Sequence, residues 1–271
     1  MTHTGPSDSS DARPIGVFDS GVGGLSVLQA IRHELPAEDI LYVADSRYAP
    51  YGERPAAFIE ARAMAIVSVF IGQGAKAAVV ACNTATAAAA AALRARFPLP
   101  IVAMEPAVKP AVTRTRTGKV GVLATTHTLS STKFLDLVDA HGGGVELLIQ
   151  PCPGLVERVE QGDLDSDVTR GLVRRYVEPL LARGVDTLVL GCTHYPFLRP
   201  VIEATAGPHV TVIDPTHAVA RELRRRLDGA GLLAAHSRPG TERFWTSGDV
   251  GRVRPVIAQL WRAGTVVEAL P

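Results

Sequence analysis

The stretches Ala78–Ala85 (AVVACNTA) and Thr187–Pro196 (TLVLGCTHYP) decide the fold of this chain. Each is a short hydrophobic run that stops at a small residue, a cysteine and a cluster of hydroxyl or amide side chains. Such a run is typical of a buried parallel strand that ends at a site. Because ligands of open α/β sheets bind beyond the carboxyl ends of the strands, we expect Cys82 and Cys192 to lie where chemistry takes place.

The residues before these two cysteines follow the same pattern twice. Strands are predicted at Ile15–Phe18 and Val120–Ala124, and both contain a hydrophobic-Gly-Val-hydrophobic run. Each opens an alternation of strands and helices that closes on a cysteine, which indicates parallel sheets. We therefore predict an α/β fold of two pseudo-symmetric parallel-sheet domains, with the active site at their interface.

The domain boundaries follow from where this pattern starts and stops. Residues 1–13 hold Ser, Thr, Asp, Gly and Pro with nothing to pack, so we expect a disordered leader. The strand predicted at Arg243–Ser247 and the helix at Val250–Leu260 have no partner in the second half, so we expect them to return to the first. The first domain is then 14–104 plus 217–271, and the second is 105–216.

Composition restricts the class of protein. The 271 residues are 46% hydrophobic and 20% charged, with a formal net charge of +1. These values are typical of a soluble globular protein and give no bulk attraction for nucleic acid. No apolar stretch is long enough for a membrane span, and no signal peptide is evident. Three cysteines do not make a disulfide framework, so we expect a cytoplasmic protein with reduced thiols.

A glycine-rich turn, Asp19–Gly24 (DSGVGG), joins the first strand to a helix predicted at Leu25–Leu35. Backbone N–H groups of such a turn at a helix N-terminus can bind a phosphate or a carboxylate. The turn lacks the Lys-Ser/Thr of a P-loop, and its spacing does not fit the dinucleotide-binding pattern. It therefore indicates an anion site without indicating a nucleotide.

Cysteine side chains are more often packing groups than catalysts, so position must distinguish them. Cys152 lies in a rigid Pro-Cys-Pro turn and is interpreted as structural, whereas Cys82 and Cys192 follow strands and precede polar pairs. His194 is two residues from Cys192 and suits a group that holds or accepts its proton, although it could be an ordinary histidine. Asp19 could orient Cys82 in the same way, or merely cap a turn.

Glu160, in the stretch Leu155–Gly162 (LVERVEQG), is most simply a solvated helix residue. Two cofactor hypotheses are also disfavoured. Cys82, Cys192 and His194 could supply zinc ligands, but their spacing does not match a zinc knuckle, so no metal is expected. Pyridoxal phosphate requires a Schiff-base lysine, and no lysine lies at a predicted strand end beside a phosphate-binding turn.

Two thiols, each at the end of a strand in a different half of the chain, suit a reaction that takes place on both faces of one carbon atom. A thiolate could remove a proton from one face of a carbon while a thiol delivers one to the other, which inverts the stereocentre. The resulting carbanion must be held by fixed donors around its carboxylate, for which the Asp19–Gly24 turn, Asn83 and Thr84 are candidates.

Four motifs together resemble the glutamate racemases of the aspartate/glutamate racemase family: Ile15–Val27 (IGVFDSGVGGLSV), the Tyr51-Gly52 pair, Ala81–Ala85 (ACNTA) and Leu188–Pro196 (LVLGCTHYP). The likeness runs from about Ile15 to the last helix. It implies a cytoplasmic, homodimeric, cofactor-independent enzyme that interconverts L- and D-glutamate and supplies D-glutamate for peptidoglycan.

The resemblance also implies roles for individual residues. Cys82 and Cys192 would be the acid/base pair, with Asp19 assisting Cys82 and His194 assisting Cys192. Glu160 matches the glutamate of a Val-Glu-x-Gly motif, although the nearby Glu157 could compete for that role. The implied substrate contacts are Asp19, Ser20, Tyr51, Gly52, Asn83, Thr84, Thr193 and His194.

Two alternatives remain open at this point. Related scaffolds with one or two cysteines racemise aspartate, or decarboxylate or isomerise other small diacids. A non-enzymatic protein that closes two domains on a carboxylate would need only the glycine turn, but it would leave the paired cysteines without a purpose.

Overall fold

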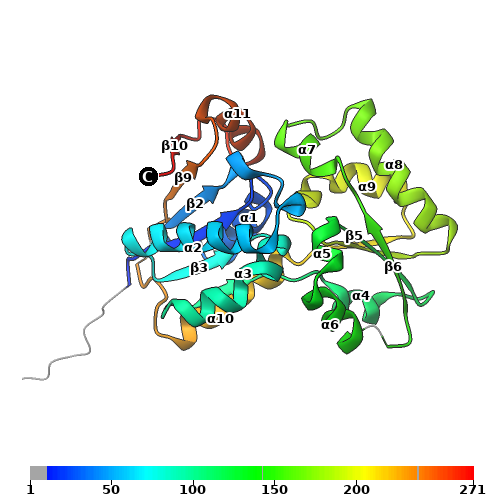
Figure 1. Cartoon of the computed structure of the whole chain (residues 1–271), viewed down its shortest axis with the longest axis horizontal. Coiled ribbons are helices and arrows are strands. Elements are labelled where there is room, and N and C mark those ends of the chain that lie inside the picture. The colour runs from blue at the N-terminus through cyan, green and yellow to red at the C-terminus, as the bar shows by residue number, and fades with distance from the viewer. Residues whose placement is uncertain (1–10, 142, 237) are drawn as a thin grey trace, which may run out of the picture.

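The computed structural model describes residues 11–141, 143–236 and 238–271, and its ribbon forms two lobes (Figure 1). The first lobe holds a six-stranded sheet of order β10-β9-β2-β1-β3-β4, and the second a four-stranded sheet of order β6-β5-β7-β8. All pairings in these two sheets are parallel, which confirms the predicted fold class. The strands are β1 (Ile15–Asp19), β2 (Ile40–Ala44), β3 (Ala77–Val80), β4 (Ile101–Ala103), β5 (Lys119–Ala124), β6 (Glu146–Pro151), β7 (Thr187–Leu190), β8 (Thr211–Ile213), β9 (Glu242–Thr246) and β10 (Val267–Ala269).

The two sheets share one topology. The order β2-β1-β3-β4 in the first lobe has the same pattern as β6-β5-β7-β8 in the second. In each, the chain starts in a central strand, adds the next strand on one side, and then crosses to the other side. The crevice at such a switch of direction is where open α/β sheets bind ligands. It lies between β1 and β3 in one lobe and between β5 and β7 in the other.

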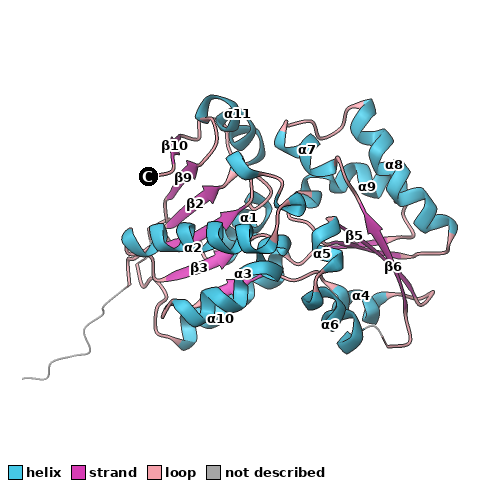
Figure 2. Ribbon diagram, viewed as in Figure 1, coloured by secondary structure: helices cyan, strands magenta, loops and turns pink. Residues whose placement is uncertain are grey.

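Helices cover both faces of the first sheet (Figure 2). Along β1, Val17 packs into the cluster that contains α1 and α10, and Phe18 into the cluster that contains α2 and α3. This alternation follows from the two-residue period of a strand that is buried on both faces. The helices of this lobe are α1 (Leu25–Glu34), α2 (Ala56–Gly72), α3 (Asn83–Arg96), α10 (Thr216–Gly229) and α11 (Val250–Leu260).

The second sheet is covered in the same way. Leu188 and Leu190 of β7 pack with α7, α8 and α9, whereas Val189 packs with α4, α5 and α6 on the other face. The helices of this lobe are α4 (Val108–Arg114), α5 (Thr126–Ser130), α6 (Thr132–His141), α7 (Leu155–Glu160), α8 (Asp167–Ala182) and α9 (Arg199–Ala206).

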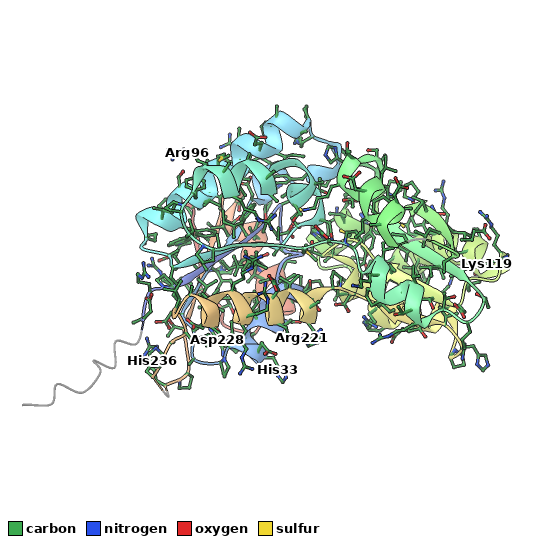
Figure 3. All side chains as sticks on the ribbon, turned by 90° about the horizontal axis from the view of Figure 1, so that it is seen from below. His33, Arg96, Lys119, Arg221, Asp228 and His236 are labelled. Atoms are coloured by element: carbon green, nitrogen blue, oxygen red, sulfur yellow. The ribbon has the colours of Figure 1, made fainter. Side chains whose placement is uncertain are left out.

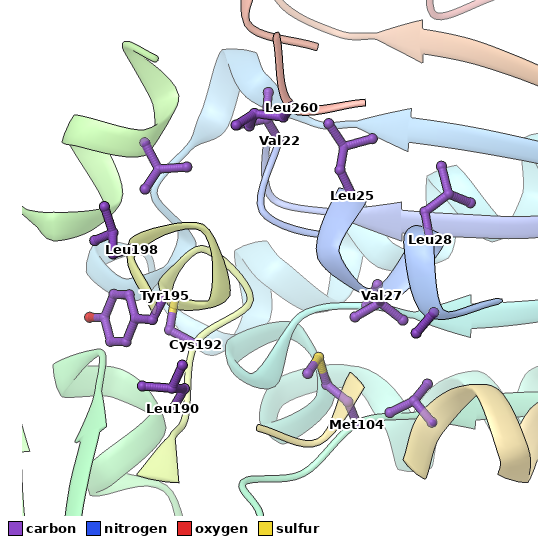
Figure 4. Packing of buried hydrophobic residues seen from close by; sticks show 14 of the residues in the cluster. Val22, Leu25, Val27, Leu28, Met104, Leu190, Cys192, Tyr195, Leu198 and Leu260 are labelled. Carbon is purple, nitrogen blue, oxygen red and sulfur yellow. The ribbon is translucent and has the colours of Figure 1, made fainter. Parts of the chain in front are cut away.

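One hydrophobic cluster runs through both lobes (Figure 4). Val27 and Leu28 of α1 belong to it, and so do Leu190 and Tyr195 of the second lobe, with Met104 in the connecting segment. Burial of apolar side chains is the main favourable term in folding, so this shared cluster couples the two lobes. The strand ends of the two sheets are thereby held close together.

The elements differ from the predicted ones in a few places. A turn at Thr125–Thr128 followed by a helix is predicted after β5, but the Thr125 hydroxyl accepts the N–H of Thr128 and α5 starts within this stretch. The helix predicted at Gly171–Ala182 starts earlier, at Asp167, because Ser166 caps it, and α4 and β10 match no predicted element. Of the predicted leader, residues 1–10 lie outside the described residues. The next three form no helix or strand, and the Asp11 carbonyl accepts a hydrogen bond from Lys76 at 2.7 Å.

The surface carries charges of both signs. Arg221 and Asp228 point outward from α10, and Arg96 and Lys119 lie on other faces (Figure 3). Within the described part of the chain, no helix is both long and apolar enough to cross a membrane. The domain boundaries given above stay a prediction.

Candidate active site

Both predicted catalytic cysteines lie at strand ends and line one cavity. Cys82 follows β3 and is the N-cap of α3, and Cys192 follows β7. The cavity between them has a volume of about 10 Å³, enough for a single water. Its lining also includes Ser20, Pro50, Tyr51, Gly52, Asn83, Thr84, Thr125, Val156, Gly191, Thr193 and His194.

Cys82 is paired with a carboxylate on the neighbouring strand. Asp19 ends β1, which pairs with β3, and it is fully buried. The Cys82 sulfur lies 3.9 Å from the Ser20 hydroxyl, which in turn donates to the Asp19 carboxylate at 3.4 Å. Burial, followed by the charge of Asp19, raises the pKa of Cys82 well above its usual value. The hydrogen bond from the N–H of Ala85 to the sulfur lowers this pKa, but its effect is smaller. Burial also raises the pKa of Asp19.

Cys192 is paired with an imidazole. Its Sγ lies 3.6 Å from Nδ1 of His194, and Nε2 of His194 lies 2.6 Å from Oε1 of Glu160. Burial disfavours the imidazolium, but the hydrogen bonds to Cys192 and Glu160 outweigh this and raise the pKa of His194 well above its usual value. The arrangement therefore favours a positively charged His194 beside the Cys192 sulfur.

Glu160 is not the solvated helix residue that its sequence context favours. Its carboxylate accepts the N–H of Val22 at 2.7 Å as well as contacting His194, so it joins the second lobe to the glycine turn of the first. Glu160 is thus the glutamate that contacts His194, and it lines a larger neighbouring cavity together with Glu157.

The glycine turn binds carboxylates of the protein itself. The N–H of Val22 donates to Glu160, and the N–H of Gly24 donates to Asp19 at 2.7 Å. A Cβ at Gly21 would overlap the Glu160 carboxylate, and one at Gly23 would overlap the His194 ring. The N–H groups of Val22 and Gly24 thus bind carboxylates, as the sequence of the turn predicts, but these carboxylates belong to the protein.

The remaining predicted contact residues surround the cavity. Ser20 and Thr193 lie at its base, where the Thr193 hydroxyl donates to Asp19 at 3.3 Å. Tyr51 and Gly52 come from the segment after β2, and Thr84 from the start of α3. Asn83 is buried, and in the described structure its side-chain amide has neither of its polar atoms hydrogen-bonded. An unpaired buried amide facing a cavity is suited to bind a polar ligand.

Two features of the site were not predicted from the sequence. Thr125 lines the cavity, and its hydroxyl lies 3.0 Å from the hydroxyl of Thr128 in the same lobe. It also lies 3.0 Å from the hydroxyl of Thr84, and this contact joins the two lobes. Since Thr125 follows β5 as Ser20 follows β1, the internal repeat could have indicated it. The second feature is a buried carboxylate, Asp45, which accepts a hydrogen bond from the Tyr51 hydroxyl.

Cys152 keeps its structural interpretation. It is buried below the cavity, and its thiol donates to the Gln150 carbonyl at 3.3 Å. In residues 11–141, 143–236 and 238–271, no group of three or more His, Cys, Asp or Glu side chains is arranged to hold a metal ion.

The chain matches one family model, described as Asp/Glu/hydantoin racemase, over residues 15–223. A glutamate racemase from Methylococcus capsulatus is 55% identical over 263 residues, which cover 97% of each chain.

Solved structures extend this similarity to the fold. The crystal structure of a glutamate racemase isoform from Bacillus anthracis is 33% identical, with a TM-score of 0.87, and the match covers 96% of this chain and 98% of that one. The glutamate racemase from Francisella tularensis, solved in complex with D-glutamate, is 28% identical, with a TM-score of 0.82 and the same coverage of each chain.

Proposed function

This chain belongs to the Asp/Glu/hydantoin racemase family, and on that premise we propose that it interconverts L-glutamate and D-glutamate. Its relatives at more than half identity over nearly the whole chain are named glutamate racemases. The observation that carries the proposal is the placement of two thiols, one from each sheet, on a single buried cavity.

The proposed reaction is a proton transfer between the two sulfurs. A thiolate on one side removes the α-hydrogen of glutamate as a proton, and the electron pair of the broken C–H bond is delocalised into the α-carboxylate. The thiol on the other side then donates its proton to the opposite face of the α-carbon. The product is the other enantiomer, and the two sulfurs have exchanged protonation states.

The surroundings of the thiols support an assignment of their resting states. His194, held by Glu160, lies 3.6 Å from the Cys192 sulfur, so we assign Cys192 as the base at the start of the reaction. Burial and the charge of Asp19 raise the pKa of Cys82, so Cys82 is the resting acid. After one turnover the roles are reversed, and His194 and Asp19 assist their return.

Groups around the cavity supply the binding contacts. The unpaired amide of Asn83 and the hydroxyls of Ser20, Thr84 and Thr193 can bind the carboxylates and ammonium of glutamate. Donors fixed before the substrate arrives stabilise the developing negative charge without reorganisation. The two-thiol chemistry requires neither a metal nor an organic cofactor, so we propose a cofactor-independent enzyme.

Its cellular role follows from the family resemblance. We propose that the enzyme works in the cytoplasm as a homodimer and supplies D-glutamate for peptidoglycan. An alternative substrate is another small dicarboxylate such as aspartate, because both thiols would act identically on its α-carbon. The names of the high-identity relatives favour glutamate.

The test is optical. Purified protein without added cofactor is mixed with L-glutamate, and the circular dichroism of the amino acid is followed with time. The signal should decay to zero, and D-glutamate should decay to the same end point. A flat trace with glutamate would refute the proposal, and decay with L-aspartate alone would establish the alternative.

A further inference from the structure

The segment Ser46–Glu53 delivers Tyr51 and Gly52 to the cavity but has little regular structure of its own. It consists of two short 3₁₀ turns, at Ser46–Tyr48 and Tyr51–Glu53. Gly52 packs closely against Thr125 of the second lobe, where an added Cβ would lie 3.0 Å from the Thr125 Cβ. Small shifts of this segment therefore change the shape of the site, so the groups that fix it matter.

Asp45, the residue directly after β2, fixes the segment through its carboxylate. It is fully buried and accepts a hydrogen bond from the Tyr51 hydroxyl. Arg62 of α2 donates to the same carboxylate through two nitrogens, Nε to Oδ2 at 2.9 Å and Nη2 to Oδ1 at 2.8 Å. A bidentate pair of this kind is strong and directional, so it sets the orientation of the carboxylate that Tyr51 meets.

Aromatic side chains shield this pair from solvent. The Arg62 guanidinium lies 4.5 Å from the centre of the Tyr48 ring, which packs edge-on against Phe58. A cation over an aromatic face gains further stability when it is partly desolvated. Burial, followed by the Asp45 charge, raises the pKa of Tyr51 well above its usual value, so its hydroxyl remains a donor at any working pH.

Asp45 is also connected to β1, the strand that carries Asp19. The backbone N–H of Asp45 donates to the carbonyl of Asp19 at 3.0 Å. Arg62 itself does not line the cavity, so its influence on a ligand must pass through Asp45 and Tyr51. A link from α2 to the substrate-binding segment thus runs beside the Cys82 half of the site.

We propose that Asp45 and Arg62 are positioning residues that hold Tyr51 and Gly52 against the substrate and thereby set the affinity for glutamate. This inference rests on the proposed function. The competing interpretation is that the pair only fastens α2 to β2, in which case its loss would change the folded fraction but not the binding of glutamate.

The experiment compares wild type with Arg62→Met, Arg62→Lys, Tyr51→Phe and the double variant Arg62→Met/Tyr51→Phe. Because a positioned contact is lost, KM for glutamate should rise about tenfold in Arg62→Met and Tyr51→Phe while kcat changes by less than about threefold. Arg62→Lys keeps the charge but loses the two-nitrogen geometry, so its KM should fall in between. The double variant should resemble the worse single variant, because both changes release the same segment.

Arg54→Met is the matched control. Arg54 directly follows the same segment and its guanidinium is over the Phe58 ring, but it is exposed, and in the described structure the Asp45 carboxylate pairs with Arg62 and not with Arg54. Its KM and kcat should equal those of wild type. Melting temperatures identify any variant that has lost its fold, in which case Tyr51→Phe, which removes only one oxygen, decides the question.

The outcomes separate the two proposals. If wild type and Arg54→Met racemise glutamate but KM is unchanged in Arg62→Met and Tyr51→Phe, the positioning role is refuted and the proposed function stands. The positioning role would also be refuted if the increase in KM of the double variant equalled the product of the two single increases, since Arg62 and Tyr51 would then act separately. If wild type does not racemise glutamate, the proposed function fails and this inference fails with it.

Discussion

The two halves of the site are built on one topology but differ in their chemistry. β1 and β3 place Asp19 and Cys82 side by side, whereas in the second half the counterpart of Asp19 at the end of β5 is Ala124, and Cys192 follows β7. In the first half the thiol lies near a buried carboxylate, Asp19. In the second half it lies beside an imidazole, His194, that contacts a glutamate from α7.

This difference shows how a repeated scaffold can serve a two-sided reaction. A thiol beside a buried carboxylate tends to keep its proton, whereas a sulfur beside an imidazolium tends to lose it. Two identical halves would give both sulfurs the same resting state. On the proposed mechanism, the unequal partners would give one acid and one base before the reaction, which is what a single proton transfer across the cavity requires.

The largest expected effect comes from removing either thiol. Cys82→Ala and Cys192→Ala should each lower racemisation by at least about a thousandfold, because one face of the α-carbon then has no proton donor or acceptor. In D₂O each variant should still exchange the α-hydrogen of one enantiomer, and the two variants should act on opposite enantiomers. Exchange of the same enantiomer by both would contradict the two-sided arrangement.

Changing the partners of the thiols should have the next largest effect. Asp19→Asn and His194→Asn should each lower kcat/KM by about a hundredfold, in the range typical of acid/base assistance. Since the enantiomers of glutamate have equal free energies in water, kcat/KM must fall equally in both directions. The halves should be distinguished by α-hydrogen exchange in D₂O, where each variant slows one enantiomer more than the other. If both variants slowed exchange of the two enantiomers equally, Asp19 and His194 would each act on both thiols, which would contradict this assignment.

Glu160→Gln should give a smaller loss with a pH signature. The contact with Glu160 helps to raise the pKa of His194, so its neutralisation should lower that pKa and let the imidazolium lose its proton at lower pH. The high-pH limb of kcat/KM should therefore move to lower pH, with activity reduced about tenfold at the optimum. Glu157→Gln is the control, and its profile should overlay that of wild type. A shift in Glu157→Gln alone would reverse the assignment of the motif glutamate.

The smallest effect is expected at the hydroxyls that join the lobes. Thr128 is buried, and its hydroxyl lies 3.1 Å from that of Thr84 in the first lobe. Thr128→Val keeps the shape but removes this contact, so it should lower the free energy of unfolding by about 1 kcal/mol. Chemical denaturation measures this value. A loss of activity without a loss of stability would instead indicate that the hydroxyl cluster acts on the substrate.

Most of the scaffold could be predicted from local sequence. Buried parallel strands are short hydrophobic runs, so the strands predicted at Ile15–Phe18 and Val120–Ala124 each lie within one residue of the limits of β1 and β5. Helix α4 was missed because Pro106 and Pro110 indicate a loop, and β10 because three residues give too short a signal. The strand-end cysteines were found for a physical reason, since parallel strands deliver their carboxyl ends to one edge.

The parts of the site that could not be predicted are those formed by distant residues. Nothing in the LVERVEQG run shows that Glu160 reaches His194 and the N–H of Val22, because that contact needs both lobes. The pairing of Arg62 with Asp45 likewise depends on how α2 packs against β2. Sequence periodicity predicts which face of an element is buried, but it does not predict which polar group meets which across an interface.

The two contacts of Glu160 connect the packing of the lobes with the surroundings of Cys192, because Glu160 binds both the Val22 N–H and His194. The cavity between the sulfurs holds only about 10 Å³, so an amino acid enters only after the lobes separate. Separation of the lobes would take the Val22 N–H away from Glu160 and expose the His194–Cys192 pair to water. On the proposed mechanism, the surroundings of Cys192 would then be complete only in the closed molecule.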